Sequence, residues 1–344
     1  MPRTAMSQAA SPAAAPVVAS RGASKAARLP SDRWRLLEIA FWVAIVAVYF
    51  VFPSYLVLGS QILIIGMFAV TLDLILGYAG IVSLGHAAFF GLGAYTAGLL
   101  AVHGWGEPIT GLFAAAVVAA IGGYLASFLV VRGSDLTRLM VTLGIGLMMF
   151  EAANKAAFIT GGVDGLSGVT MWKILGFFGF DLYGRTAYVY SLVVVFVLFL
   201  IARRLVHSPF GLSLRGIREN TRRMPAIGTQ VGARLRQIFT VSAAMAGVCG
   251  ALLAQCTQFV GIDTLSFGRS ADLLIMLVLG GTGRLYGGLV GAAAFMIAQD
   301  YLSGINPVYW QFWIGALLVA IVLFAQGGIL GAVGKLYAAV KRAR

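Results

Sequence analysis

Apolar stretches alternate with short polar or glycine-rich breaks along most of this chain. Stretches of this kind predict helices that cross a hydrocarbon layer, because a helix bonds its own backbone polar groups and about 20 residues span the layer. We place spans at 36–54, 58–77, 84–103, 109–131, 137–159, 187–202, 237–261, 271–281, 286–302 and 309–331. The pattern predicts an all-α polytopic membrane protein with about ten transmembrane spans, with nine as the alternative.

Two glycine-rich breaks interrupt the apolar pattern. The first reads Gly-Tyr-Ala-Gly over 77–80, and the second reads Gly-Gly-Thr-Gly-Arg over 280–284. The span before the second break is too short to cross a hydrocarbon core that needs about 20 helical residues. We therefore predict a short broken helix at 271–281. Discontinuous helices often line the substrate path of transporters.

The composition excludes several classes of protein. Of the 344 residues, 60% are hydrophobic and only 11% are charged, whereas soluble domains carry about 25% charged residues. A chain so poor in charge could not cover its apolar surface in water. Soluble enzymes, nucleic-acid-binding proteins and disordered proteins are excluded.

The basic residues indicate the orientation in the membrane. The formal net charge is +13, and Lys and Arg accumulate in cytoplasmic loops of membrane proteins. With a cytoplasmic N-terminus, only four of the 25 basic residues fall toward the outer side, namely Lys155, Lys173, Arg185 and Arg269. The charge thus predicts cytoplasmic N- and C-termini and contact with membrane lipid rather than nucleic acid.

The chain divides into three parts by composition. Residues 1–35 are rich in Ala, Ser and Pro and predict a disordered cytoplasmic tail, an organelle transit peptide being the alternative. We expect residues 36–332 to form the transmembrane domain and residues 333–344 to form a basic cytoplasmic tail. Cys249 and Cys256 lie seven residues apart, too far along one helix to form a disulfide.

Asp73 and His86 are ionisable residues on either side of the first break. Such residues are costly inside a membrane and usually face a cavity or a partner, although packing near the cytoplasmic edge is the alternative. The candidate translocation path or gate consists of Asp73, Gly77, Gly80, Ser83, Gly85, His86, Gly280 and Gly283. No catalytic arrangement, metal-ligand spacing or phosphate-binding loop occurs in the sequence. We therefore expect neither an enzyme nor a bound cofactor.

A long basic loop at 203–236 contains eight arginines and one acid, Glu219. A positive-inside anchor or a patch for anionic lipid would explain the charge. Neither would require an amphipathic segment at 214–223 followed by Pro225 and Gly228. This order predicts a short helix parallel to the membrane that is offered to a cytosolic partner.

Several segments resemble a known family. They are GYAGIVSLGHAAFFGLGAYTAG (77–98), TGGVDGLSG (160–168), GIRENTRRMPAIG (216–228) followed by SAAMAGVCGALLA (242–254), and LLIMLVLGGTGRLYGGLVGA (273–292). In this order they resemble the LivM-type permease of branched-chain amino acid ABC transporters. The likeness extends from about 36 to 331.

The resemblance implies a subunit of an importer in the bacterial inner membrane. Its expected partners are a second permease of the LivH type, two cytosolic ABC ATPases that use the ATP, and a periplasmic solute-binding protein. The loop resembles the segment that docks on an ATPase, with the coupling residues Arg215, Arg218, Glu219, Asn220, Arg223, Ala226 and Gly228. Pro225 departs from the family pattern, which leaves the docking geometry open because Pro inside a helix causes a kink.

Two points stay open at the level of sequence. A proton-coupled secondary transporter would use Asp73 and His86 as a relay, and a membrane-embedded enzyme is a remote second alternative. LivM-like permeases also serve systems for urea, short amides and aromatic acids, so branched-chain amino acids are only the most common substrate class for such a chain.

Overall fold

The computed structural model describes residues 36–173, 179, 181, 184–307, 309–324 and 327–332. The predicted tails at 1–35 and 333–344 lie outside the described residues. Within this part of the chain almost every segment is helical, and backbone pairing of the strand type is limited to one bridge between Leu166 and Val260. The predicted all-α class is confirmed.

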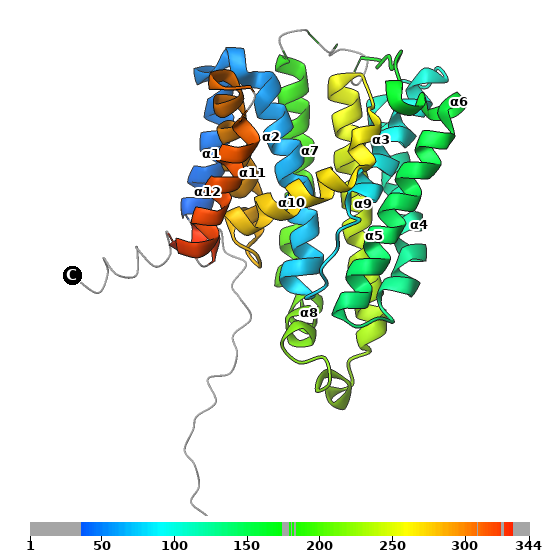
Figure 1. Cartoon of the computed structure of the whole chain (residues 1–344), viewed down its shortest axis with the longest axis vertical. Coiled ribbons are helices and arrows are strands. Elements are labelled where there is room, and N and C mark those ends of the chain that lie inside the picture. The colour runs from blue at the N-terminus through cyan, green and yellow to red at the C-terminus, as the bar shows by residue number, and fades with distance from the viewer. Residues whose placement is uncertain are drawn as a thin grey trace, which may run out of the picture. The chain divides into compact units, whose positions relative to one another are not determined.

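The described helices follow one another along the chain as Figure 1 shows. Their bounds are α1 Leu36–Val51, α2 Leu56–Asp73, α3 Ala87–Val102, α4 Pro108–Val130, α5 Asp135–Lys155, α6 Ala157–Thr160, α7 Arg185–His207, α8 Pro209–Glu219, α9 Val231–Thr257, α10 Phe267–Gly280, α11 Leu285–Ile305 and α12 Trp310–Phe324. Short turns of other helix types are η1 Pro53–Tyr55, η2 Leu74–Tyr78, η3 Gly162–Asp164, η4 Met224–Ile227 and η5 Ile262–Leu265.

Six of the described helices are long and apolar enough to cross a membrane. They are Pro53–Tyr78, Pro108–Val130, Asp135–Lys155, Arg185–His207, Val231–Thr257 and Leu285–Ile305, and Glu38–Val51 and Ala87–Val102 are shorter apolar helices. Each of the ten predicted spans overlaps one of the helices α1–α5, α7 or α9–α12. The number that crosses the bilayer stays a prediction.

The core forms where α2 and α9 pass through the bundle. Small residues allow close packing there, since a Cβ atom at Gly93 of α3 would collide with the carbonyl oxygen of Gly247 on α9. In contrast, 6% of an apolar 18-residue stretch of α5 is buried, against 72% of the corresponding stretch of α9. Helix α5 is therefore peripheral in this subunit.

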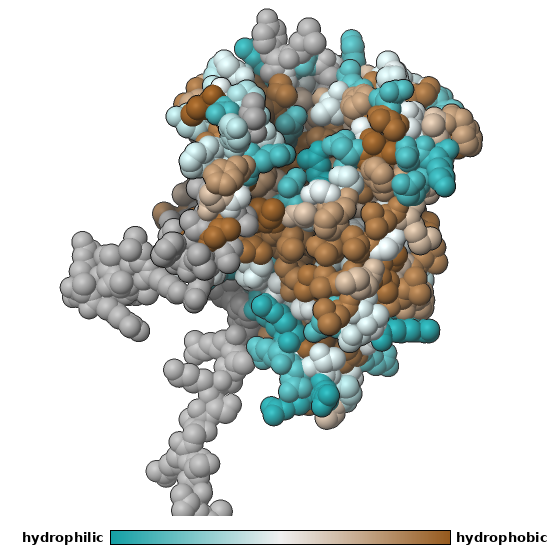
Figure 2. All heavy atoms as spheres, viewed as in Figure 1, coloured by the Kyte–Doolittle hydropathy of each residue, from teal (hydrophilic) through white to brown (hydrophobic). Residues whose placement is uncertain are grey.

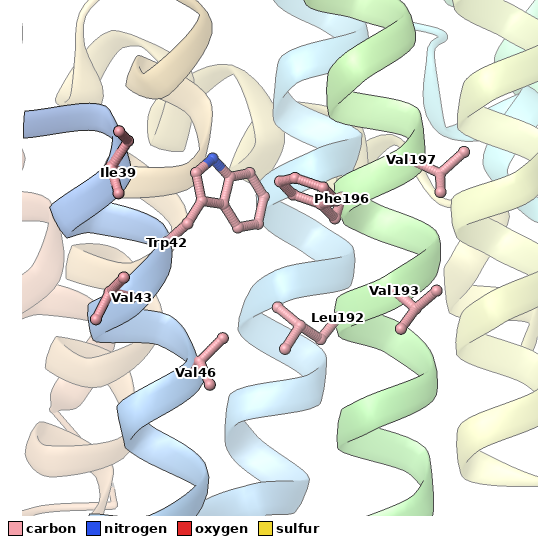
Figure 3. A pocket seen from close by; sticks show the side chains of 8 residues that line it. All are labelled: Ile39, Trp42, Val43, Val46, Leu192, Val193, Phe196 and Val197. Carbon is pink, nitrogen blue, oxygen red and sulfur yellow. The ribbon is translucent and has the colours of Figure 1, made fainter. Parts of the chain in front are cut away.

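The outer surfaces suit a hydrocarbon environment. Figure 2 shows apolar residues gathered across the middle of one face, with hydrophilic residues toward its lower end. A groove of about 640 Å³ between α1 and α7 is lined by aliphatic and aromatic side chains only (Figure 3). Exposed apolar area of this extent is typical of contact with lipid or with another membrane subunit.

The short broken helix is confirmed. Helix α10 has 14 residues, starts earlier than predicted at Phe267, and runs obliquely across the bundle before ending at Gly280 (Figure 1). Helix α2 ends in the wider turn η2, and no helix forms between Tyr78 and Ala87. Both breaks therefore interrupt helices at the positions where the glycines occur.

The amphipathic helix of the basic loop exists but begins earlier than predicted. Helix α8 covers Pro209–Glu219 and not 214–223, because Ser208 caps its start by accepting a hydrogen bond from the Gly211 amide, and Pro209 favours the first turn. Gly211, Leu214 and Ile217 form its buried face. Figure 1 shows α8 at the lower end of the helical bundle.

Candidate functional site

The two glycine-rich breaks meet in space. The side chain of Asp73, at the end of α2, is buried and accepts a hydrogen bond of 2.7 Å from the backbone amide of Gly283. A Cβ atom at Gly77 would collide with Asp73 Oδ1 and would lie 2.5 Å from the Gly283 nitrogen. Glycine at position 77 therefore permits the approach of two breaks that are about 200 residues apart in the sequence.

Helix α8 contacts the same place. The guanidinium of Arg218 donates a hydrogen bond to the carbonyl oxygen of Gly77. Both Gly80 and Gly283 have a φ of +76°, and a Cβ atom on either would lie 3.1–3.2 Å from the Arg218 side chain. We call Asp73, Gly77, Gly80, Arg218 and Gly283 the junction, because they join both breaks to α8.

A second arginine of α8 strengthens this contact. The Arg215 guanidinium lies 5.2 Å from the centre of the Tyr78 ring, within the range of a cation–π interaction. A cavity of about 460 Å³ opens beside the junction and is lined by Gly77, Tyr78, Arg215, Arg218, Glu219 and Gly283. Movement of α8 would therefore act directly on the ends of both broken helices.

Gly280 lies apart from this group. A Cβ atom there would collide with the carbonyl oxygen of Gly287 on α11, so Gly280 serves the close packing of α10 on α11. It belongs to the break in sequence, but its contacts are structural.

His86 also lies in a separate cluster. Its Nε2 atom is 3.0 Å from the hydroxyl of Thr71 and 3.4 Å from that of Ser242. Both hydroxyl hydrogens are already committed, since Thr71 donates to the Phe68 carbonyl and Ser242 donates to the Thr71 carbonyl. The Nε2 atom is therefore the one that carries a hydrogen and donates it to these hydroxyl oxygens. Within the described residues, Nδ1 has no hydrogen-bond partner.

The remaining residues of the first break pack against other helices. A Cβ atom at Gly85 would collide with the Thr142 carbonyl of α5, and the amide of Leu84 donates to the Thr142 hydroxyl. Ser270 of α10 contacts the start of α3, because its hydroxyl oxygen accepts a hydrogen bond of 3.0 Å from the Ala87 amide. The Ser83 hydroxyl is buried without a hydrogen-bond partner in the described part of the chain.

Asp73 and His86 therefore belong to different hydrogen-bond groups. Asp73 is bonded to the second break, whereas His86 is bonded to hydroxyls of α2 and α9, and no described hydrogen bond joins the two. Among the described residues, no group of three or more His, Cys, Asp or Glu side chains could hold a metal ion.

Residues 220–228, which follow α8, are exposed except for Met224, and we call this segment the exposed tip. The Asn220 side chain accepts hydrogen bonds from the amides of Arg222 and Arg223, which turns the chain away from the helix. Pro225 lies in the first turn of η4, where its missing amide is not needed. The departure at Pro225 thus causes no kink, and Gly228, with φ +81°, ends the turn.

Most of the predicted coupling residues are exposed at the end of α8 and in this tip. Glu219, Asn220, Arg223, Ala226 and Gly228 are all exposed. Met224 of the same segment is instead buried, because it folds back and packs near Gly216 of α8. The tip and α8 therefore form one unit whose inner side contacts the junction.

Sequence analysis missed the hydroxyl residues of the site. Thr71, Thr142, Ser242 and Ser270 each bond a break or the residue next to it. Their only signal in the sequence is a hydroxyl within an apolar helix, which more often bonds the preceding turn of its own helix.

Comparison with known proteins identifies the family. Residues 54–322, which include both breaks and α8, match the family described as the permease component of the branched-chain amino acid transport system. The chain belongs to this family. It is 30% identical over 286 residues to the high-affinity branched-chain amino acid transport system permease protein LivM of Escherichia coli, and 30% identical over 282 residues to LivM of Salmonella typhimurium.

Each LivM match covers 75% of this chain and 66% of the relative. A more limited match, 30% identical over 128 residues, links the chain to the LivH permease of Escherichia coli and covers 36% of this chain and 41% of LivH. No solved structure matches the chain. The permease family thus contains the junction, α8 and the exposed tip within its matched region.

Proposed function

We propose that this chain is a membrane permease subunit of an ABC importer that carries branched-chain amino acids across the bacterial inner membrane. The family and the LivM relatives support this function. The LivH likeness supports a second, related permease as partner. Two cytosolic ATPases and a periplasmic solute-binding protein would complete the importer, so this chain itself needs no bound cofactor.

The contact between α8 and the two breaks is the observation that carries the mechanism. Arg218 bonds the first break, and Asp73 of the first break bonds Gly283 of the second. A force applied by an ATPase at the exposed tip would reach both breaks through one arginine. The glycines with positive φ can absorb the change in backbone dihedral angles. Alternating access then follows as the broken helices shift against the rest of the bundle.

The proposed orientation rests on the role given to α8. As the docking element for cytosolic ATPases, α8 lies on the cytoplasmic side, and the arginines of 203–236 obey the positive-inside rule there. Cytoplasmic N- and C-termini are part of the same proposal.

The first experiment is a purification of this chain from its native membrane in mild detergent, with mass spectrometry of the proteins that accompany it. We expect two ATPases and a second permease of similar hydropathy. A matched purification of the variant Arg218→Gln tests the same complex with a weakened junction, and assembly should persist because the exposed tip is unchanged. Recovery of the wild-type chain alone, or as a homo-oligomer, would contradict the importer.

A proton-coupled secondary transporter is the alternative. It predicts uptake that stops with a protonophore and continues without ATP. The importer predicts the reverse in vesicles loaded with ATP. The separate bonding of Asp73 and His86 favours the importer.

A further inference from the structure

A small cavity lies at the far ends of α2 and α10 from the junction. It has a volume of about 200 Å³, below the roughly 300–1,000 Å³ of pockets for drug-sized ligands, which suits a small solute. Gln61 of α2 lies 12 residues before Asp73, and Arg269 of α10 lies 11 residues before Gly280. At 1.5 Å per residue, Gln61 lies about 18 Å from Asp73 along α2, and Arg269 lies about 16 Å from the end of α10.

The rim of this cavity carries one positive and one negative side chain. Arg269 Nη2 and Asp263 Oδ2 are 2.8 Å apart, and their side chains are 31% and 65% exposed. The ion pair is thus open to solvent within this subunit and accessible to a solute. Thr257 and Gln61 add polar groups to the lining.

Apolar side chains also line the cavity. Ile65 of α2, Leu253 of α9 and Met296 of α11 line it. Methionine is unbranched and adapts to side chains of different shape. A lining that combines an exposed ion pair with apolar side chains matches the chemistry of a zwitterionic amino acid with an aliphatic side chain.

We propose that this cavity is a transient binding site for the transported amino acid, which rests on the proposed function. Arg269 binds the carboxylate, Asp263 binds the ammonium group, and the aliphatic side chain packs against Ile65, Leu253 and Met296. The ion pair between the two side chains exchanges for two ion pairs with the solute, so no charge is left unpaired. Helices α2 and α10 connect the site to the junction that α8 contacts.

The test measures binding of radiolabelled leucine to the purified permease–ATPase complex without the solute-binding protein. We expect Arg269→Gln and Asp263→Asn each to weaken leucine binding at least tenfold. The matched control is the ion pair of α5 between Arg138 and Asp135, which measures 3.0 Å, has side chains 17% and 83% exposed, and does not line the cavity. Arg138→Gln and Asp135→Asn should leave binding within twofold of the wild type. Unchanged binding in both rim variants would overturn the site.

A second variant separates binding from a merely structural ion pair. Met296→Trp enlarges an apolar side chain that lines the cavity and so reduces the space for the aliphatic side chain of the solute. It should weaken leucine binding at least fivefold while changing alanine binding less than twofold. An ion pair that only holds the start of α10 predicts an unchanged preference between leucine and alanine. That result would overturn the proposal even if the rim variants lost binding.

The wild-type complex also separates failure of the site from failure of the proposed function. Uptake of leucine by the full importer with no binding to the permease complex would overturn the site and leave the function in place. Absence of ATP-driven uptake of any branched-chain amino acid by the full importer would overturn the function itself.

Discussion

The junction and the small cavity are the two polar regions connected by α2 and α10, and they are built in different ways. The junction depends on backbone groups and glycines, with Asp73 buried and bonded to an amide. The cavity depends on two exposed side chains of opposite charge. A region built from backbone contacts tolerates almost no added atom, whereas a region built from exposed charges tolerates change in shape but not in charge. The two regions should therefore respond to different kinds of substitution.

The largest effect is expected from a side chain added at the junction. Gly283→Val and Gly80→Val should each abolish uptake and leave complex assembly intact, because both glycines have φ +76° and lie against Arg218. Uptake in vesicles and co-purification of the partner subunits measure the two properties. Gly104→Val is the matched control, since Gly104 has φ +87° and no atom within 4 Å of its Cβ position. Normal uptake by the junction variants would contradict the proposal that the breaks act as a gate.

Loss of the charged contact at the junction should have a smaller effect. Arg218→Gln is expected to reduce leucine uptake about tenfold, consistent with the roughly 1.5–3 kcal/mol of a hydrogen bond to a charged group. ATP hydrolysis should fall less than uptake, because the ATPases stay docked but lose their link to the breaks. The ratio of leucine transported to ATP hydrolysed is the measurement. Arg132→Gln changes another exposed arginine and should leave that ratio unchanged. An equal fall of the ratio in this control would show that loss of positive charge, and not loss of the junction contact, causes the effect.

An ion pair outside both regions should affect stability rather than transport. Arg203 of α7 binds Glu38 of α1, with side chains 6% and 21% exposed. Glu38→Gln should destabilise the subunit by roughly 2 kcal/mol, somewhat less than a fully buried pair, because Glu38 is partly exposed. The thermal unfolding midpoint measures this loss. Asp135→Asn, in an exposed pair, should change the midpoint little, and uptake per assembled complex should be unchanged in both variants.

The smallest effect is expected at His86. His86→Gln keeps a donor for the Thr71 hydroxyl, so uptake per assembled complex should stay within twofold of the wild type. Uptake should also stay insensitive to a protonophore in ATP-loaded vesicles. A loss of more than tenfold with intact assembly would restore His86 as a candidate for the transport path.

Much of the fold could be predicted because it depends on local pattern. The apolar runs predicted the helices, and the glycines predicted where α2 and α10 are interrupted. Boundaries were less accurate: α8 begins at Pro209 because of its Ser208 cap, a local signal that the charge pattern of the loop obscured. The junction was predicted only as a set of candidates. Its members lie in the two breaks and in the basic loop, and no local sequence pattern reveals that these three segments are close in space.

The sequence by itself determined the membrane class, the helical architecture, the two breaks and the family likeness, since hydropathy and glycine act over short stretches of chain. Only the tertiary structure decided that Gly77 meets Gly283 and that Arg218 reaches both. It also placed Asp73 and His86 in different hydrogen-bond groups, although they are 13 residues apart, and brought Asp263 and Arg269 beside Gln61 and Met296. The physical reason is that these contacts depend on how helices pack side by side, and packing joins residues by distance in space rather than along the chain.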